Sequence, residues 1–308
     1  MVTFDPPDGA GTSGLQTGRI EAAAVAPAPR SRRRNVSLAL GAGILLFWIA
    51  VAALAPLLAP DDPYLQDLPH RLLRPFWEAK SSPSHLLGTD QFGRDYLSRL
   101  IYASRISLAV GFGAAAIAGV IGVGLGLLAG YFGGRVDAAV TFLISVRLAL
   151  PLILVALSLV SLTGNSLPVV IVTLGLLMWD RFAVVTRTAA QQVARREFVG
   201  ASELLGSPRW WIVLAVLLPN IANSIIVVAT LEIAHAMLLE AALSFLGVGI
   251  APPTPSLGIM IAQARPYLFF EVWMIALPGL ALFSLVLAVN LFGDGVRDAT
   301  SPGAVARL

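Results

Sequence analysis

The chain has 308 residues, of which 57% are hydrophobic and only 13% are charged. A soluble core of this size does not need so much apolar surface, so the composition predicts a membrane protein. The absence of cysteine excludes disulfides and thiolate metal sites. The formal net charge of +3 says little by itself, and the three histidines, His70, His85 and His235, are too scattered to predict a histidine-based metal site.

The first segment, residues 1–35, is rich in Gly, Pro, Ala and Ser and ends in a basic run from Arg30 to Arg34. This composition predicts a disordered basic tail. The stretch Asn35–Pro60 carries no charge and predicts a first transmembrane helix over 36–60. It is too long for the apolar core of a signal peptide and follows about 35 residues, so we expect a retained helix.

A polar loop over 61–105 separates this helix from the uncharged stretch Ile106–Gly134, which predicts the second span. Small residues recur at every fourth position along it. The members of this ladder are Ala114, Ala118, Gly122, Gly126, Gly130 and Gly134. Such a face allows close helix packing in lipid. Packing within this subunit is the favoured interpretation, and packing against a partner subunit is the alternative.

The third span is predicted over Ala138–Leu162, interrupted by Arg147, and a tight turn follows at 163–166. A fourth begins near Leu167 and has Asp180 and Arg181 near its end.

The fifth span, Pro219–Leu246, contains three ionisable residues, Glu232, His235 and Glu240. Ionisable groups inside a span are costly and usually face protein or water. Glu232 and His235 share a helix face and are candidates for a transport pathway, although a structural hydrogen-bonded pair is the favoured alternative. Glu240 is a third candidate, more in keeping with bracing the junction between helix and loop.

The sixth span is predicted over Val272–Gly293, with a tail over 295–308. Three prolines precede it at Pro252, Pro253 and Pro255. Stiffening of this outer loop is the favoured interpretation, and a docking surface is the alternative. The fold class is therefore all-α, with six transmembrane helices.

The basic residues predict the orientation. With the N-terminus inside, 13 of the 21 lysines and arginines fall on the inner side, seven on the outer side and Arg147 within a span. Six of the outer seven belong to the long loop 61–105, where the positive-inside rule is weakest. Both termini are therefore predicted to be cytoplasmic.

Motifs for ATP hydrolysis are absent from the sequence. The only lysine is Lys80, and Ala79 precedes it, so the Gly-Lys step of a phosphate-binding loop does not occur. There is no G-x-S-x-G elbow, H-E-x-x-H pair or cysteine cluster either. The sequence therefore predicts no enzyme and no cofactor.

The polar stretch Glu197–Asn220 between two spans has its own pattern. It predicts two short helices joined at Gly206, with Ser207 as the cap and Pro208 as the first residue of the second. The apolar side chains Phe198, Val199, Leu204 and Leu205 recur at helical spacings. On a cytoplasmic loop such a face needs a protein to cover it. Covering by the membrane surface is disfavoured by the acidic Glu197 and Glu203.

This stretch resembles the signature of the membrane subunits of ATP-driven importers: E-A-A, three residues, Gly, nine residues, an aliphatic, one residue and Leu-Pro. Here the Gly is Gly206 and the last positions are Val216, Leu218 and Pro219. The segments HLLGTDQFGRDYLSRLIYASRISLAVGFG, GLLAGYFGGRVD, LEAALSFLGVGIAPPTPSLGIMIAQARPYL and PGLALFSLVLAVNLFGDGVRDATSP resemble the C-type permeases of the dipeptide, oligopeptide and nickel group. Together these matches extend over most of 85–302.

The resemblance implies the fold of a type I ABC importer permease, with a five-helix core over 106–294 and an ATPase-coupling segment over 195–218. It implies four kinds of partner: a homologous B-type permease, two ATPase domains, an extracytoplasmic solute-binding protein and the bilayer of a bacterial inner membrane. No nucleic acid is expected. The coupling residues it implies are Glu197, Phe198, Val199, Ala201, Leu204, Leu205, Gly206, Ser207 and Pro208.

The sequence departs from this family at five positions. Gly200 and Ser202 replace the Glu and the second Ala of the signature, and Asp180 replaces a usual Pro after Trp179. Phe142 and Ser145 stand where the family commonly has an Arg and an Asp. These changes leave the substrate in doubt and do not affect the predicted architecture.

The predicted function is half of an alternating-access pathway for di- or oligopeptides. The same fold importing nickel or another small solute is the alternative within this class. An ion-coupled secondary transporter, a different class, is expected to have internal repeats with broken helices, and neither is evident in the sequence. A membrane enzyme has no polar constellation to support it. The substrate itself is not readable from the sequence.

Overall fold

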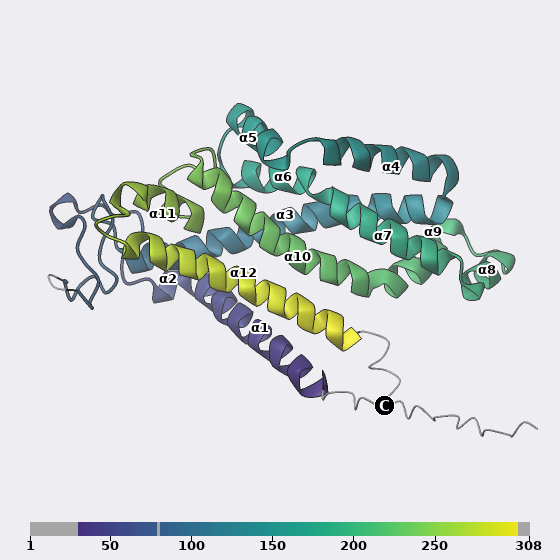
Figure 1. Cartoon of the computed structure of the whole chain (residues 1–308), viewed down its shortest axis with the longest axis horizontal. Coiled ribbons are helices and arrows are strands. Elements are labelled where there is room, and N and C mark those ends of the chain that lie inside the picture. The colour runs from purple at the N-terminus through teal and green to yellow at the C-terminus, as the bar shows by residue number, and fades with distance from the viewer. Residues whose placement is uncertain (1–29, 79–80, 301–308) are drawn as a thin grey trace, which may run out of the picture.

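The structure, a computed structural model, describes residues 30–78 and 81–300. Helices run lengthwise through an elongated bundle, and the described residues contain no strand (Figure 1). The prediction of an all-α chain is therefore confirmed. The main helices are α1 (Arg30–Ala53), α2 (Ala55–Leu58), α3 (Tyr96–Phe132), α4 (Gly134–Ala149), α5 (Leu152–Thr163), α6 (Leu167–Leu177), α7 (Trp179–Ala194), α8 (Glu197–Leu204), α9 (Arg209–Trp211), α10 (Leu218–Phe245), α11 (Leu257–Ala264) and α12 (Trp273–Thr300).

Shorter helical pieces join these elements. A π-helical segment, η2 (Ile212–Leu217), connects α9 to α10. Two 3₁₀ turns, η1 (Leu68–His70) and η3 (Arg265–Tyr267), lie in the loops before α3 and α12.

Four stretches of the described chain are long and apolar enough to cross a membrane: Tyr96–Phe132, Leu167–Ala194, Arg209–Phe245 and Trp273–Ala299. The pair α4 and α5 makes a fifth span if the two are counted as one. The apolar part of α1, Ser37–Ala53, is shorter than the roughly 20 residues of a usual span. Length and composition thus support five of the six predicted spans, from the second to the sixth, if α4 and α5 are counted as one. The first span, over 36–60, stays a prediction.

Several predicted boundaries are wrong. The first helix begins at Arg30, so the basic run assigned to a disordered tail is helical. Residues 1–29 of that tail lie outside the described residues. The last helix extends to Thr300, past the predicted end at Gly293. The final residues, 301–308, also lie outside the described part.

The second span begins at Tyr96 and not at Ile106. Asp95 caps it, since its Oδ2 accepts a hydrogen bond from the Ser98 amide at 2.7 Å. Arg99, whose charge argued against a helix here, is buried and pairs with Asp90 at 3.3 Å. The first turns of α3 were therefore predicted as loop because they carry a charge, and that charge is paired with Asp90 in the folded chain.

The third predicted span is broken. α4 and α5 are bent by 83° relative to one another, and Leu150, before Pro151, is extended, with φ −92° and ψ 127°. A proline disfavours helical backbone in the residue before it, which explains the break. This bend corrects the expectation that the chain has no broken helix.

The small-residue ladder packs inside the subunit, as favoured. A Cβ built on Gly122, Gly126 or Gly130 would come closer than 3.0 Å to atoms of α7. The missing side chains let α3 and α7 approach closely. Packing against a partner does not explain these three glycines.

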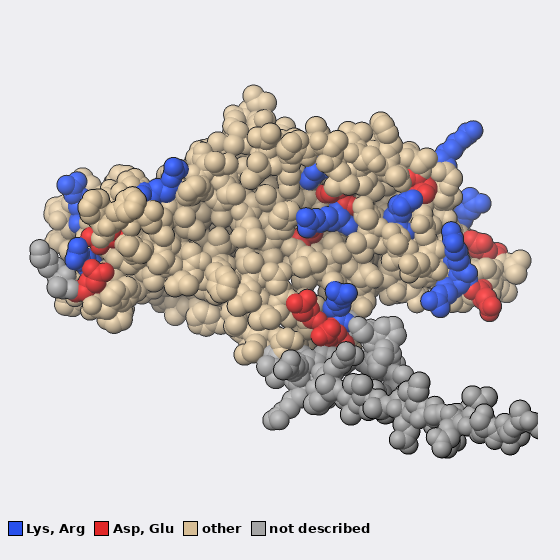
Figure 2. Space-filling model, in the orientation of Figure 1, with Lys and Arg blue, Asp and Glu red and all other residues tan. Residues whose placement is uncertain are grey.

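In this view, charged side chains gather at the end that holds the long loop and over the half of the molecule that holds α7 and α8, and a largely uncharged surface separates the two regions (Figure 2). The loop over 61–95 lies at one end and α8 at the other (Figure 1). This distribution places the predicted coupling segment at the opposite end of the bundle from the long loop.

Candidate functional site

The coupling segment is a short helix with a tight C-terminal turn. α8 ends at Leu204, and Gly206 adopts φ +77°. The Gly206 amide donates to the Glu203 carbonyl at 3.0 Å, and the Ser207 amide donates to the Ser202 carbonyl at 3.1 Å. This pair of bonds is the Schellman motif, which requires a left-handed residue where Gly206 stands. The predicted left-handed turn at Gly206 is therefore present.

The second predicted helix differs from the expectation. Ser207 makes no capping bond, and Pro208 lies just before α9 as its N-cap. α9 is not a separate helix either, because it continues through η2 into α10. Pro219 lacks an amide hydrogen and its ring crowds the carbonyl four residues earlier. The wider π-helical turns immediately before it accommodate that ring.

The apolar residues of the segment divide into two groups. Leu204 and Leu205 are 92% and 86% exposed, and Phe198 is also exposed. Val199 is 1% exposed and packs within the subunit. The four predicted residues therefore do not form one exposed face. Val199 anchors α8, and the other three are left uncovered.

The side chain of Val199 packs against three other helical elements. Val199 belongs to a buried cluster with Leu127 of α3, Ala190 of α7 and Ile212 of η2. Beside it, the Tyr131 hydroxyl of α3 donates to Glu203 Oε1 at 2.8 Å. α8 therefore packs directly on α3, α7 and η2.

The pathway candidates occupy a charged cavity away from this segment. A cavity of about 420 Å³ is lined by the break between α4 and α5, the junction of α6 and α7, and α10. Glu232 and His235 both line it. A group of basic and acidic atoms lies over the junction of α6 and α7, surrounded by uncharged surface (Figure 2).

Two ion pairs, Arg181–Glu232 and Arg147–Asp180, bring sequence-distant charges together here, and His235 adds a contact with its sequence neighbour Glu232. Arg181 Nη1 of α7 lies 3.1 Å from Glu232 Oε1 of α10, and His235 Nδ1 lies 3.6 Å from Glu232 Oε2. Arg147 Nη2 lies 3.6 Å from Asp180 Oδ1. In the sequence, Arg147 lies far from Asp180 and Arg181, and all three lie far from Glu232. Their grouping is not predictable from the sequence, because no short-range pattern links α4, α7 and α10.

Glu240 does not join this cavity. It is fully buried, and its Oε1 accepts hydrogen bonds from Ser244 Oγ at 2.7 Å and Ser256 Oγ at 2.8 Å. Ser256 also caps α11. Glu240 therefore ties α10 to the following helix, which agrees with the bracing role favoured from the sequence and not with a pathway role.

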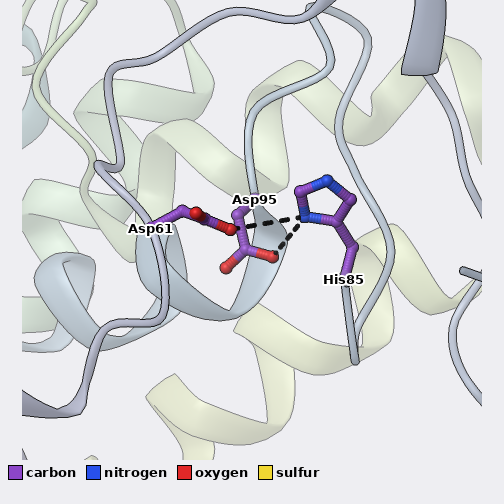
Figure 3. Close-up of side chains that lie close together, drawn as sticks. All are labelled: Asp61, His85 and Asp95. Carbon is purple, nitrogen blue, oxygen red and sulfur yellow. Dashed lines mark hydrogen bonds and ion pairs between the residues drawn. The ribbon is translucent and has the colours of Figure 1, made fainter. Parts of the chain in front are cut away.

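A third group lies at the opposite end, on the long loop and at the start of α3 (Figure 3). His85 Nδ1 is 3.0 Å from Asp95 Oδ1 and 3.7 Å from Asp61 Oδ2. These donor atoms lie within 4.8 Å of one another, a spacing that suits a metal ion. The histidine count alone could not show this group. Hydrogen bonding of one imidazole to the carboxylate that caps α3 also accounts for the arrangement.

Of the five departures from the family pattern, four lie outside the charged groups described above. Phe142 and Ser145 are exposed on α4, and the Ser145 hydroxyl donates to the Thr141 carbonyl. Gly200 faces open space, and the Ser202 hydroxyl donates to the Phe198 carbonyl. Asp180 alone joins a charged group.

Comparison with known proteins agrees with this architecture. The family described as "binding-protein-dependent transport system inner membrane component" matches residues 122–304. The family described as "N-terminal TM domain of oligopeptide transport permease C" matches residues 30–75. The chain belongs to the C-type permeases of the dipeptide, oligopeptide and nickel group of ABC importers. It is a multi-pass inner-membrane permease subunit, and this membership separates it from the secondary transporters.

Curated relatives cover both substrate types. The dipeptide transport system permease protein DppC of Haemophilus influenzae is 40% identical over 85% of this chain and 90% of the relative. The di/tripeptide permease protein DppC of Pseudomonas aeruginosa is 40% identical over 86% and 88%. The nickel permease protein NikC of Escherichia coli is 38% identical over 84% and 93%.

A solved structure supports the fold. A chain of the MetNI methionine ABC transporter, in an inward-facing conformation, matches with a TM-score of 0.56 at 20% identity. The match covers 65% of this chain and 95% of that one.

Proposed function

We propose that this chain forms half of a translocation pathway for di- or oligopeptides, in a heterodimer with a B-type permease. ATP is hydrolysed on separate ATPase subunits, a solute-binding protein delivers the peptide from outside, and this chain is itself not catalytic. The two peptide permeases at 40% identity support the substrate class. The nickel permease at 38% identity keeps a small metal solute as the second candidate.

The observation that carries the coupling role is the uncovered pair Leu204 and Leu205 on a rigid corner. Side chains so exposed at the polar end of a membrane protein favour a protein partner. The corner is fixed by Gly206, and α8 is held by Val199. In this proposal the ATPase receives the corner in a cleft, and closure of the motor domains moves α8 and the helices packed on it.

Both termini are proposed to lie in the cytoplasm. The basic residues favour this orientation. The described ends of the chain, at the start of α1 and the end of α12, lie near one another, away from the loop over 61–95 (Figure 1). The coupling segment then faces the compartment that contains ATP.

The decisive experiment is uptake by the complete complex, reconstituted in proteoliposomes with its ATPases and binding protein. Accumulation of a labelled dipeptide, dependent on ATP and binding protein, is the expected result. Accumulation of Ni²⁺ without dipeptide would select the second candidate. ATP-independent uptake that follows an ion gradient would contradict the importer mechanism.

A further inference from the structure

The charged cavity lies where two helices are interrupted. One wall is the break between α4 and α5 at Pro151, another is the end of α6 near Met178, and α10 supplies the third. Its volume of about 420 Å³ lies within the range of small-molecule sites, roughly 300–1,000 Å³. Much of the remaining lining is apolar, from the leucines and the isoleucine around the break.

Arg147 and Asp180 are already engaged in the structure. Arg147 Nε donates to the Leu177 carbonyl, at the end of α6 where helical carbonyls lack partners. Asp180 lies in the first turn of α7, where a negative charge is favoured. Both side chains are nearly buried. This pair completes the helix junction and has little capacity left for a ligand.

Arg181 is different, because its charge is accessible. Its side chain is 58% exposed, whereas that of its partner Glu232 is 2% exposed. A guanidinium has five N–H donors, and the bond to Glu232 engages Nη1. The carboxylate beneath fixes the guanidinium and leaves other donors free for a ligand. The exposed charge on this wall is therefore positive.

His235 adds a second polar group. Its side chain is 31% exposed, and among the described residues its Nδ1 is buried without a hydrogen-bond partner. Its Nδ1 lies 3.6 Å from Glu232 Oε2, one helical turn away, and this contact is too long for a hydrogen bond.

We propose that Arg181 binds the carboxylate of a short peptide as it passes through this cavity, with Glu232 positioning the guanidinium. This inference rests on the proposed peptide function. The fork of a guanidinium matches a carboxylate in two parallel bonds. The apolar wall contacts the side chains of the peptide without selecting among them. The exposed guanidinium repels a free divalent cation, so the cavity favours a carboxylate solute over Ni²⁺.

The test uses the reconstituted complex and a labelled dialanine probe. The double variant Arg181→Gln/Glu232→Gln removes both charges without leaving a buried one unpaired. We expect it to copurify with its partners and to lose dialanine uptake by roughly tenfold or more, the loss expected for one charge-assisted bond. Arg181→Lys keeps the charge without the fork and is expected to lose less.

Arg135→Gln serves as the control, because Arg135 is exposed at the start of α4 and does not line the cavity. It is expected to leave uptake unchanged. Full uptake by the double Gln variant would overturn the inference. Loss of assembly in that variant would also overturn it, by making the pair structural. A wild-type complex that takes up no dipeptide would remove the peptide function itself, and this inference with it.

Discussion

Gly206 illustrates how one backbone angle shapes a docking surface. Its φ of +77° allows the two Schellman bonds that end α8, and the space around it is open. A side chain at this position is therefore opposed by the backbone and not by a clash within the subunit. The strain is on the order of 1 kcal/mol or more.

Replacement of Gly206 by Asp is expected to abolish ATPase binding or transport-linked ATP hydrolysis, while the permease still inserts. The strained turn and the added side chain both disturb the exposed corner. Copurification of the ATPase and substrate-stimulated hydrolysis measure the effect. Gly200→Glu is the matched control, because Gly200 is also open and has no positive φ. A Gly206→Asp protein with full ATPase binding and stimulation would contradict the coupling assignment.

Glu232→Gln and His235→Ala are expected to reduce uptake while leaving assembly intact. The first removes the charge that holds Arg181 and leaves a neutral acceptor oxygen, so the guanidinium is held less firmly. The second removes the imidazole from the cavity wall. Uptake assays and copurification separate the two effects. If either variant failed to assemble, the pair would be structural and the pathway role would be lost.

At the scale of the elements, α8 is held to the bundle by one buried side chain. Val199→Ala removes two methyl groups from the cluster beneath α8, a loss of roughly 2 kcal/mol. We expect faster amide hydrogen exchange in α8 and weaker coupling of ATP hydrolysis to uptake. Val136→Ala, at an exposed valine of α4, is the control. Unchanged exchange in α8 would show that Val199 is not its anchor.

The junction of α10 and α11 depends on Glu240. Glu240→Ala leaves the Ser244 and Ser256 hydroxyls without their acceptor, at a cost of roughly 1–3 kcal/mol for each buried group. Glu240→Gln keeps an acceptor oxygen and is expected to cost less. In thermal unfolding of the purified complex, we expect the melting temperature to decrease from the wild type to the Gln variant and further to the Ala variant. A stable Ala variant would exclude a bracing role.

Across the whole molecule, turns that depend on neighbouring residues are predictable from the sequence, and charge pairs that depend on distant residues are not. The turn at Gly206 follows from neighbouring residues and is present. The turn predicted over 163–166 is a connection over 164–166, because Thr163 is the last residue of α5. The start of α3 was misplaced, because the partner that hides Arg99 lies in the preceding loop. The cavity was missed for the same reason, since Arg147, Asp180 and Glu232 come from three helices. The break at Pro151 has a local signal in the proline itself, although the long apolar stretch around it predicts an uninterrupted span.

The orientation of the bundle in the membrane can be tested by cysteine labelling. The chain has no cysteine, so single cysteines at Ser84 and Leu308 report their own exposure. A membrane-impermeant maleimide should label Ser84→Cys, on the long loop, in intact cells. Leu308→Cys should be labelled only after permeabilisation, because the basic residues keep the termini inside. Labelling of the loop only after permeabilisation would show that the orientation of the chain is the reverse of the predicted one. α8 would then face away from any cytoplasmic ATPase, and the coupling proposal would fall with the orientation.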